Sequence, residues 1–228
     1  MTSLLLASAS PARRATLAAA GIDASVLVSG VDEDAALAAA TQRFGPLDPV
    51  DAVLVLAQVK AQAVAEVLDG DERPDGLPDD VLVLGCDSLL ELDGAAFGKP
   101  RDAADATARW RTMRGRSGVL HTGHWLIDTR PVGDGQGTGT LGATASTTVH
   151  FADLSDAEID AYVATGEPLA VAGAFTVDGL GGPFVTGIDG DYHSVVGLSL
   201  PLLRELLAEV GVAITDLWSP ASAAPDLG

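Results

Sequence analysis

The sequence predicts a mixed α/β fold with an α+β-like arrangement, and three observations support this prediction. Short apolar runs typical of buried strands alternate along the chain with segments of helical hydrophobic spacing. Two strand-like segments in the middle of the chain are joined without a helix, so the sheet should contain antiparallel as well as parallel neighbours. The chain has 228 residues, of which 47% are hydrophobic, so it is long enough to bury a core.

The first predicted elements are a strand, a helix and a second strand. Residues 4–7 and residues 24–29 are apolar runs of strand length. Between them, Ser10 can cap a helix and Pro11 suits its first position. Gly21 suits the end of that helix.

A long helix and a central strand follow. Residues 50–68 have apolar side chains at helical spacing, whereas residues 69–80 are polar and rich in turn formers. Residues 81–86 form an uninterrupted apolar run, which predicts a buried central strand. Residues 102–113 predict the next helix.

The second half of the chain predicts a hairpin and then shorter elements. Residues 119–128 and 145–151 are strand candidates, and the glycine-rich residues 129–144 between them predict a mobile hairpin loop. The remaining predicted elements are a helix at residues 155–164 that opens with a capping box, short strands at residues 184–188 and 194–197, and a helix at residues 199–210.

The charge of the chain excludes a general nucleic-acid-binding surface. Its formal net charge is −19 and its pI is about 4.2, whereas binding to a polyanion depends on clustered Lys and Arg. An anionic small ligand is not excluded, because a few basic groups or a metal ion in one cleft reverse the local field.

The chain is expected to be cytoplasmic and to lack a membrane span. It contains no run of 18 apolar residues. No basic residue precedes the first apolar segment, so this segment predicts a strand and not a signal peptide. Cys86 is the only cysteine, which excludes an internal disulfide and fits a reducing compartment.

Residues 8–14 are the first candidate for chemistry, as an anion-binding site. A strand leads directly into the start of a helix, where backbone N–H groups are unpaired, and Ser8, Arg13 and Arg14 are close by in sequence. The planar guanidinium group of arginine suits phosphate. The alternative is an ordinary capped helix with solvated arginines.

Asp87 is the second candidate, as a catalytic carboxylate. It follows the buried run at residues 81–86, and α/β proteins place functional groups at the ends of such strands. Ser88 beside it can donate a hydrogen bond. The alternative is that Asp87 caps the next turn.

The two lysines are the third candidate. The chain has 13 Lys plus Arg, and only Lys60 and Lys99 are lysine. Lys60 lies in an apolar-faced helix and Lys99 in a Gly-Lys-Pro turn, and neither is a usual position for a solubilising surface lysine. A compact ammonium group required near phosphate oxygens would explain their retention. Chance retention is the alternative.

Two further segments are candidates for ligand contacts. Glu33 lies in an acidic stretch that could bind a divalent metal through oxygen ligands, with a simple acidic turn as the alternative. Residues 162–192 are dense in glycine, which is typical of loops that pass close to a ligand. Tight turns in a small lobe are the alternative there.

Eight segments, taken in order, resemble one family from residue 4 to residue 211. They are LLLASASPARRATLAAAGI, GVDED, AQVKAQAV, VLGCDSLL, GKPRDAADA, TTVHF, AYVATGEPLAVAGAF and GIDGDYHSVVGLSL. In this order they resemble the Maf proteins, which are nucleoside triphosphate pyrophosphatases first named for septum inhibition. The resemblance implies one domain, residues 1–216, and a flexible C-terminal tail, residues 217–228. It also implies two lobes around a curved mixed sheet with the active cleft between them, similar to the inosine triphosphate pyrophosphatases.

The resemblance also implies a reaction and a set of site residues. The reaction is hydrolysis of a nucleoside triphosphate between its α- and β-phosphates, with Mg²⁺ or Mn²⁺ as cofactor. Asp87 matches the proton acceptor, and Asp87 together with Glu33 matches the metal ligands. Matches to the phosphate-binding residues are Ser8, Arg13, Lys60 and Lys99. Members of the family are often homodimers.

The base-reading positions depart from the family pattern. Ala12, Ser88 and Asp178 match neither the pyrimidine-preferring branch nor the 7-methylguanosine branch. An ionised Asp178 can only accept hydrogen bonds, which favours a base edge that donates them. We therefore expect a preference shifted from dTTP and UTP toward guanine-type or modified bases.

A histidine common in the family is also missing. This chain has Gly118 at that position, and the charge of Arg114 or Arg116 is the expected compensation. His121 and His124 are not at metal-ligand spacing with other histidines, so we interpret them as structural.

Two other classes of function remain open at this point. One is a nucleotide-binding regulator of cell division or septum formation with little turnover, and the other is a generic α/β binding module. Release of pyrophosphate would distinguish the enzyme from both.

Overall fold

A computed structural model describes residues 2–70, 73–77, 81–130 and 139–219. Within these residues seven strands form one open mixed sheet in the order β2-β1-β3-β5-β6-β7, with β4 paired to β3. β1 pairs in parallel with β2 and β3, and the other pairs are antiparallel. The strands are β1 (Ser3–Leu6), β2 (Ser25–Val26), β3 (Val81–Leu92), β4 (Ala95–Phe97), β5 (Ser117–Asp128), β6 (Thr140–Phe151) and β7 (Val185–Asp189). This sheet confirms the predicted mixed α/β fold.

Seven α-helices and four short 3₁₀ segments pack around the sheet within the described residues. The helices are α1 (Pro11–Ala19), α2 (Glu33–Phe44), α3 (Pro49–Asp69), α4 (Ala103–Met113), α5 (Asp156–Ala164), α6 (Tyr192–Val196) and α7 (Leu200–Glu209). The 3₁₀ segments are η1 (Glu167–Ala170), η2 (Ala172–Ala174), η3 (Gly182–Phe184) and η4 (Ile214–Leu217). None of the described helices combines the length and the apolar character that crossing a membrane requires.

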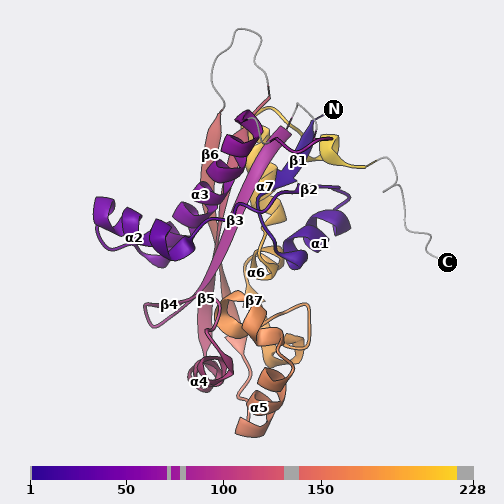
Figure 1. Ribbon diagram of the computed structural model, residues 1–228. Coiled ribbons are helices and arrows are strands. Elements are labelled where there is room, and N and C mark those ends of the chain that lie inside the picture. The colour runs from indigo at the N-terminus through magenta and orange to yellow at the C-terminus, as the bar shows by residue number, and fades with distance from the viewer. Residues whose placement is uncertain (1, 71–72, 78–80, 131–138, 220–228) are drawn as a thin grey trace, which may run out of the picture.

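Three long strands run through both lobes of the molecule. β3, β5 and β6 have 12 residues each and run through most of its length (Figure 1). In the upper lobe α3 covers one face of the sheet, where Ala61 and Val64 pack on Leu5 and Val83. α7 covers the opposite face of this lobe through a separate set of leucines.

The lower lobe has its own hydrophobic core. Trp110 of α4 and Ile159 of α5 pack on Leu90, Leu120 and Val149 of the long strands. These strand residues point to the side of the sheet opposite α3, because successive side chains of a strand alternate between its faces. The face of the sheet that carries α3 is therefore covered by that helix in the upper lobe only.

Close contact between α3 and the sheet requires two glycines. A Cβ atom on Gly85 of β3 would collide with the carbonyl oxygen of Ala57, and one on Gly123 of β5 with that of Val53. Without these side chains the helix backbone lies directly on the strands. This contact sets how far a side chain of α3 reaches over β3.

Several predicted boundaries were wrong. The central strand predicted at residues 81–86 continues to Leu92, because its second half pairs with β5 along one edge and with β4 along the other. The strand predicted at residues 24–29 is only the two-residue β2. β6 begins at Thr140, inside the loop predicted at residues 129–144. Residues 131–138 of that loop lie outside the described part of the chain.

Two helices were not predicted. The acidic stretch around Glu33 begins α2, where the Asp32 side chain accepts a hydrogen bond from the backbone N–H of Ala35 at 3.0 Å. Carboxylates in a first turn are stabilised by the helix dipole, and the following alanines favour helix. Residues 194–197, predicted as a strand, mostly belong to α6, because Asp191 caps this segment through the backbone N–H groups of His193 and Ser194.

The end of the described chain is attached to the domain. Trp218 forms an antiparallel bridge with Ile22, and the backbone N–H of Ser219 donates to the carbonyl oxygen of Gly21 at 2.9 Å. Leu217 is buried. The tail predicted at residues 217–228 therefore starts with three attached residues, and residues 220–228 lie outside the described part.

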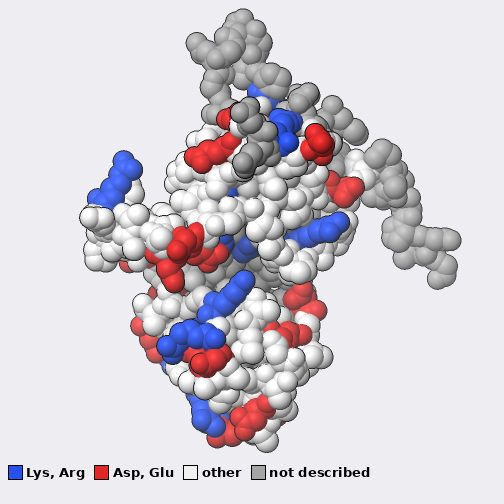
Figure 2. Space-filling view, in the orientation of Figure 1, with Lys and Arg blue, Asp and Glu red and all other residues white. Residues whose placement is uncertain are grey.

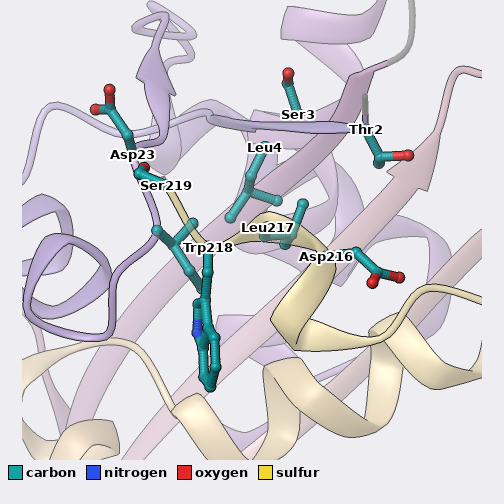
Figure 3. Close-up of a pocket in the computed structure, with 9 residues that line it drawn as sticks. Thr2, Ser3, Leu4, Asp23, Asp216, Leu217, Trp218 and Ser219 are labelled. Atoms are coloured by element: carbon teal, nitrogen blue, oxygen red, sulfur yellow. The ribbon is translucent and has the colours of Figure 1, made fainter. Parts of the chain in front are cut away.

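A shallow pocket lies beside this attachment. Its volume is about 140 Å³, and Thr2, Leu4, Asp23 and Asp216 are among the residues that line it (Figure 3). It is located at the start of β1, whereas Ser8 follows the end of that strand. The pocket is therefore separate from the residues that the sequence singles out for chemistry.

His124 connects β5 to the start of α7. Its Nδ1–H donates to the carbonyl oxygen of Thr122 at 3.0 Å, and its Nε2 accepts from the backbone N–H of Ser199 at 2.8 Å. Ser199 in turn caps α7. Burial lowers the pKa of His124 from 6.5 to about 4, so the imidazole is neutral, as its hydrogen bonds require. These contacts confirm a structural position for His124.

We predict that His124 makes the protein less stable in acid. A folded-state pKa below the unfolded value means that protonation favours the unfolded chain. The contribution of His124 is complete above pH 6.5 and is lost as the pH falls from 6.5 toward about 4. The loss should be on the order of 3 kcal/mol. Thermal unfolding of the parent and of His124→Gln across this pH range measures it, and parallel profiles for the two proteins would contradict the prediction.

Candidate functional site

The candidate site lies at a gap along one edge of β3. β5 pairs with β3 from Leu82 to Glu91 along one edge. On the other edge β1 pairs only as far as Leu84, and β4 begins only at Leu90. Among the described residues, β3 therefore has no strand neighbour on this edge at residues 85–89, which include Asp87 and Ser88. β1 stops here because Ser8, Ser10 and Pro11 turn the chain into α1.

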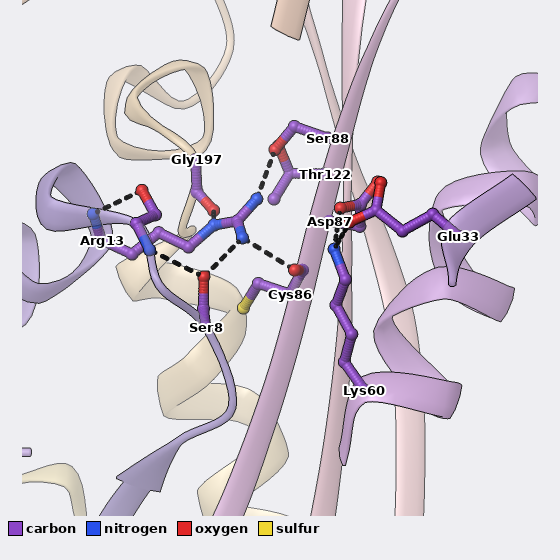
Figure 4. A network of polar contacts seen from close by, with 10 residues as sticks. Ser8, Arg13, Glu33, Lys60, Cys86, Asp87, Ser88, Thr122 and Gly197 are labelled. Atoms are coloured by element: carbon purple, nitrogen blue, oxygen red, sulfur yellow. Dashed lines mark hydrogen bonds and ion pairs between the residues drawn. The ribbon is translucent and has the colours of Figure 1, made fainter. Parts of the chain in front are cut away.

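An ion-paired cluster occupies the α3 side of this gap. The Lys60 Nζ atom lies 2.5 Å from Asp87 Oδ1 and 2.6 Å from Glu33 Oε1 (Figure 4). The side chains of Lys60 and Asp87 are 11% and 12% exposed, and that of Glu33 is 52% exposed. One ammonium group thus lies between two carboxylates, at the boundary between the protein interior and solvent.

Each member of this cluster comes from a different element. Asp87 projects from β3 toward α3, and Lys60 reaches it from the middle of that helix. Glu33 is the first residue of α2. Burial raises the pKa of the Asp87 carboxyl above its ordinary value, and the nearby Lys60 and Arg13 charges oppose this shift without cancelling it. A carboxylate with a raised pKa is a better proton acceptor near neutral pH.

Arg13 lies on the opposite side of β3 and is held by protein groups. Its Nε donates to the carbonyl oxygen of Gly197 at 2.7 Å, and its Nη1 donates to the carbonyl oxygen of Cys86 at 2.8 Å. Nη1 also donates to Ser8 Oγ at 3.0 Å, and Nη2 to Ser88 Oγ at 3.2 Å. Four of its five N–H donors therefore bond to protein. Figure 4 shows this arrangement on the side of β3 away from Lys60.

A directed chain of hydroxyl groups continues from Arg13. Thr122 Oγ1 donates to the carbonyl oxygen of Ser194 at 2.9 Å. Its contact with Ser88 Oγ at 2.9 Å must then be a hydrogen bond donated by Ser88. The hydroxyl hydrogen of Ser88 is therefore already used in the bond to Thr122, while its oxygen also accepts from Arg13.

Ser8 keeps a free donor. Its Oγ accepts from Arg13 Nη1 and from the backbone N–H of Ser10 at 3.2 Å. Within the described residues its hydroxyl hydrogen has no acceptor, so Ser8 can donate to an anion in the gap.

Lys99 approaches the same gap from the lower lobe. It lies in the turn after β4, where a Cβ atom placed on Gly98 would lie 3.4 Å from Cδ2 of Leu89. Leu89 is two residues from Asp87 and therefore on the same face of β3. The Lys99 side chain is exposed, and among the described residues it forms no hydrogen bond or ion pair. Its ammonium group is therefore an exposed cation that no described residue neutralises.

The three proposed base-reading residues are not brought together by any bond within the described residues. Ser88 is tied to Arg13 and Thr122. Ala12 is half-buried next to Arg13, and Asp178 is exposed. Asp178 lies in a loop that Glu167 holds by accepting hydrogen bonds from the N–H groups of Leu180 and Gly181, each at 3.0 Å.

The positions around the missing histidine are filled by structural contacts. A side chain at Gly118 would meet the Leu90 side chain and the backbone of Glu91. Arg116 bonds to both carboxylate oxygens of Asp93 at 2.6 Å, and Arg114 bonds to Asp156 at 2.7 Å. Both arginines are thus already neutralised by aspartates. To compensate for the missing histidine, as expected, they would have to leave these partners.

The donor groups in the gap suit a hard divalent cation. Within the described residues no group of three or more His, Cys, Asp or Glu side chains could hold a metal. Glu33 and Asp87 nevertheless supply two carboxylates that already bind one cation, the Lys60 ammonium. Mg²⁺ is commonly bound by one or two carboxylates together with substrate phosphates, so the residues fit such an ion.

Sequence reasoning missed three contributors. Thr122, Ser194 and Gly197 hold Ser88 and Arg13, but they are distant from both in sequence. Only the strand register, which places Thr122 directly opposite Ser88, connects them. No local signal in the sequence could have identified these residues.

Known proteins that are similar to this chain share one family and one name. Residues 3–210 match the family model described as Maf-like protein. A protein of Salinispora tropica named nucleoside triphosphate pyrophosphatase is 59% identical over 218 residues, which are 95% of this chain and 87% of the relative. Proteins of the same name from Leifsonia xyli subsp. xyli and Streptomyces coelicolor are each 53% identical over 96% of this chain, and over 97% and 95% of their own lengths. The chain therefore belongs to the Maf family.

Proposed function

We propose that this protein hydrolyses nucleoside triphosphates between the α- and β-phosphates to a nucleoside monophosphate and pyrophosphate. The observation that carries the proposal is the cluster of Glu33, Lys60 and Asp87 at the gap in β3. It combines a buried proton acceptor with a fixed cation, as attack on a phosphate requires. The names of the relatives support the same reaction.

In the proposed reaction Asp87 acts as the proton acceptor. It takes a proton from a water molecule whose oxygen bonds to the α-phosphorus. The bond from that phosphorus to the oxygen bridging the β-phosphate breaks, and pyrophosphate leaves with the bonding electrons. Lys60 and Lys99 neutralise charge that spreads over the phosphate oxygens.

Two other residues contribute to the proposed phosphate site. Ser8 offers its free hydroxyl hydrogen, and Arg13 supplies positive charge while most of its N–H groups hold the walls of the gap. Glu33 and Asp87 would hold Mg²⁺ or Mn²⁺, which supplies polarisation of the phosphate and acidification of bound water.

The proposed substrates are guanine-type or modified nucleotides, and removal of non-standard nucleotides is the proposed role. Asp178 supports this preference because an exposed carboxylate accepts hydrogen bonds from a base edge. Ala12 leaves space beside the gap. A cytoplasmic location and a homodimer stay predictions from the sequence and the family resemblance.

The alternative function is a nucleotide-binding regulator with little turnover. Release of pyrophosphate from a nucleotide panel, measured with Mg²⁺, with Mn²⁺ and with excess chelator, separates the two. Stoichiometric binding without product would favour the regulator. Equal turnover with and without chelator would remove the metal from the proposal.

We predict that Asp87→Asn lowers kcat by about 10²–10⁴-fold, because general base catalysis is worth that much. The activity of the parent should rise with pH through the raised pKa of Asp87, and the residual activity of the variant should lack this rise. Rates of pyrophosphate release as a function of pH measure both effects.

The same substitution should leave the fold intact. A raised pKa means that the folded protein favours the neutral carboxyl, so at neutral pH the ionised Asp87 does not stabilise the fold. Asp87→Asn should therefore unfold at no lower temperature than the parent. Asp93→Asn, at an exposed aspartate that follows β3, is the matched control and should keep full activity. A fully active Asp87→Asn enzyme would refute the assignment.

We predict that Lys99→Arg lowers kcat/KM at least tenfold although it preserves charge. The planar fork of arginine is larger and differently shaped than an ammonium group, and Lys99 lies in a tight Gly-Lys-Pro turn. Arg101→Lys is the control in the same turn, because the Arg101 side chain is 85% exposed. If the kinetics of Lys99→Arg are unchanged, an ammonium group is not required at this position, and the presence of lysine there is due to chance.

We predict that guanine-type or modified triphosphates have higher kcat/KM than dTTP and UTP. Asp178→Gln replaces an acceptor-only carboxylate with an amide that can also donate to a base carbonyl, so it should shift the ratio toward dTTP and UTP. Competition between two nucleotides in one reaction measures the ratio directly. If dTTP and UTP are clearly the best substrates of the parent, the preference is wrong while the reaction class stands.

A further inference from the structure

The turn that carries Lys99 is held by the helix that follows it. Arg109 of α4 donates from Nη1 to the carbonyl oxygen of Gly98 at 2.6 Å, and from Nη2 to the carbonyl oxygen of Lys99 at 3.4 Å. Asp105, one turn earlier on the helix, accepts from the backbone N–H of Arg101 at 3.0 Å. Hydrogen bonds thus hold the backbone on both sides of Lys99.

Arg109 and Asp105 also form an ion pair with each other. Arg109 Nη2 donates to Asp105 Oδ2 at 2.8 Å, and the two side chains are only 12% and 16% exposed. The Arg109 guanidinium lies over the Phe97 ring, 5.3 Å from its centroid. These contacts leave the Arg109 side chain little freedom.

A contact from another part of the lower lobe completes the support. The backbone N–H of Gly173, in η2, donates to the carbonyl oxygen of Gly98 at 3.1 Å. Pro100 is buried, whereas the Lys99 side chain beside it is exposed. The backbone of the turn is therefore held by several hydrogen bonds, whereas the side chain of Lys99 has no partner among the described residues.

The positive charge of Arg109 is neutralised beside Lys99. The Arg109 guanidinium bonds to the carbonyl oxygen of Lys99, and an unpaired cation there would repel the ammonium group. Asp105 neutralises it, so the pair adds no net charge beside the turn. A pair that served only to add positive charge for phosphate would not include the aspartate.

We propose that Arg109, together with Asp105, is a positioning residue that holds Lys99 where it meets the triphosphate. This inference rests on the proposed function, because it takes Lys99 as a phosphate-binding residue. Arg109 does not touch substrate. It lowers the entropy that Lys99 loses on binding, because the backbone is already in place.

A double-mutant cycle on Arg109 and Lys99 tests the proposal. Arg109→Met should lower kcat/KM about tenfold in the parent, but less than twofold in a Lys99→Ala background, where the lysine to be positioned is missing. Arg109→Lys keeps the charge but loses the fork, and it should fall between Arg109→Met and the parent. Arg111→Met, which breaks an exposed pair with Asp156 on the same helix, is the matched control and should change kcat/KM less than twofold.

The outcomes separate this proposal from the proposed function. If the parent releases no pyrophosphate, the proposed function fails. If the parent is active but Lys99→Ala is equally active, the phosphate-binding role of Lys99 fails and the positioning role is overturned with it, while the reaction class stands. If Lys99→Ala is impaired and Arg109→Met lowers kcat/KM equally in both backgrounds, or in neither, the positioning role is overturned. Hydrogen exchange of the peptide covering residues 97–102 adds a readout independent of activity. It should be faster in Arg109→Met than in the parent, and unchanged exchange would also overturn the role, even where the variant is less stable overall.

Discussion

The close contact of α3 with the sheet is the constraint on which the candidate site depends. Gly85 and Gly123 have no side chain, so the backbone of α3 lies directly on β3 and β5. Lys60 then reaches Asp87 with a buried stem and an ammonium group at the edge of solvent. A buried ion pair of this kind contributes little net stability, because desolvation of both charges offsets their attraction. Its retention fits a functional role better than a structural one.

β3 separates two kinds of polar group at the gap. On the α3 side, charges face each other with one carboxylate more than the ammonium can neutralise. On the other side, Arg13 and the hydroxyl groups of Ser88 and Thr122 form a chain that ends on backbone carbonyl oxygens. The first group is open to solvent at Glu33 and can rearrange around a ligand. The second makes most of its hydrogen bonds within the protein and fixes the walls. The two faces of one strand thus carry an ion-paired group and a hydrogen-bonded group.

Residues of the candidate site come from both lobes, which the long strands connect. Asp87 lies near the middle of β3, between the end of β1 and the start of β4. Lys60 and Glu33 come from the upper lobe, while Lys99 comes from a turn that α4 holds in the lower lobe. Figure 2 shows the surface hollowed between the two lobes, with Lys and Arg side chains near both edges of the hollow. In a chain of net charge −19, a few cations beside such a hollow can reverse the local field.

The sequence by itself determined the fold class, most helices and the residues that carry charge at the gap. These follow from local signals: apolar periodicity, the caps at Ser10 and Ser155, and a lysine kept where arginine is the rule. Only the tertiary structure decided that Ser88 bonds to Thr122, that Arg13 donates to backbone carbonyl groups, and that Arg109 bonds to the turn of Lys99. The first two depend on strand register and chain crossing, which pair residues far apart in sequence. The third depends on the angle at which α4 leaves its turn. None of these contacts is encoded in a local pattern, because each results from how separate elements pack against one another.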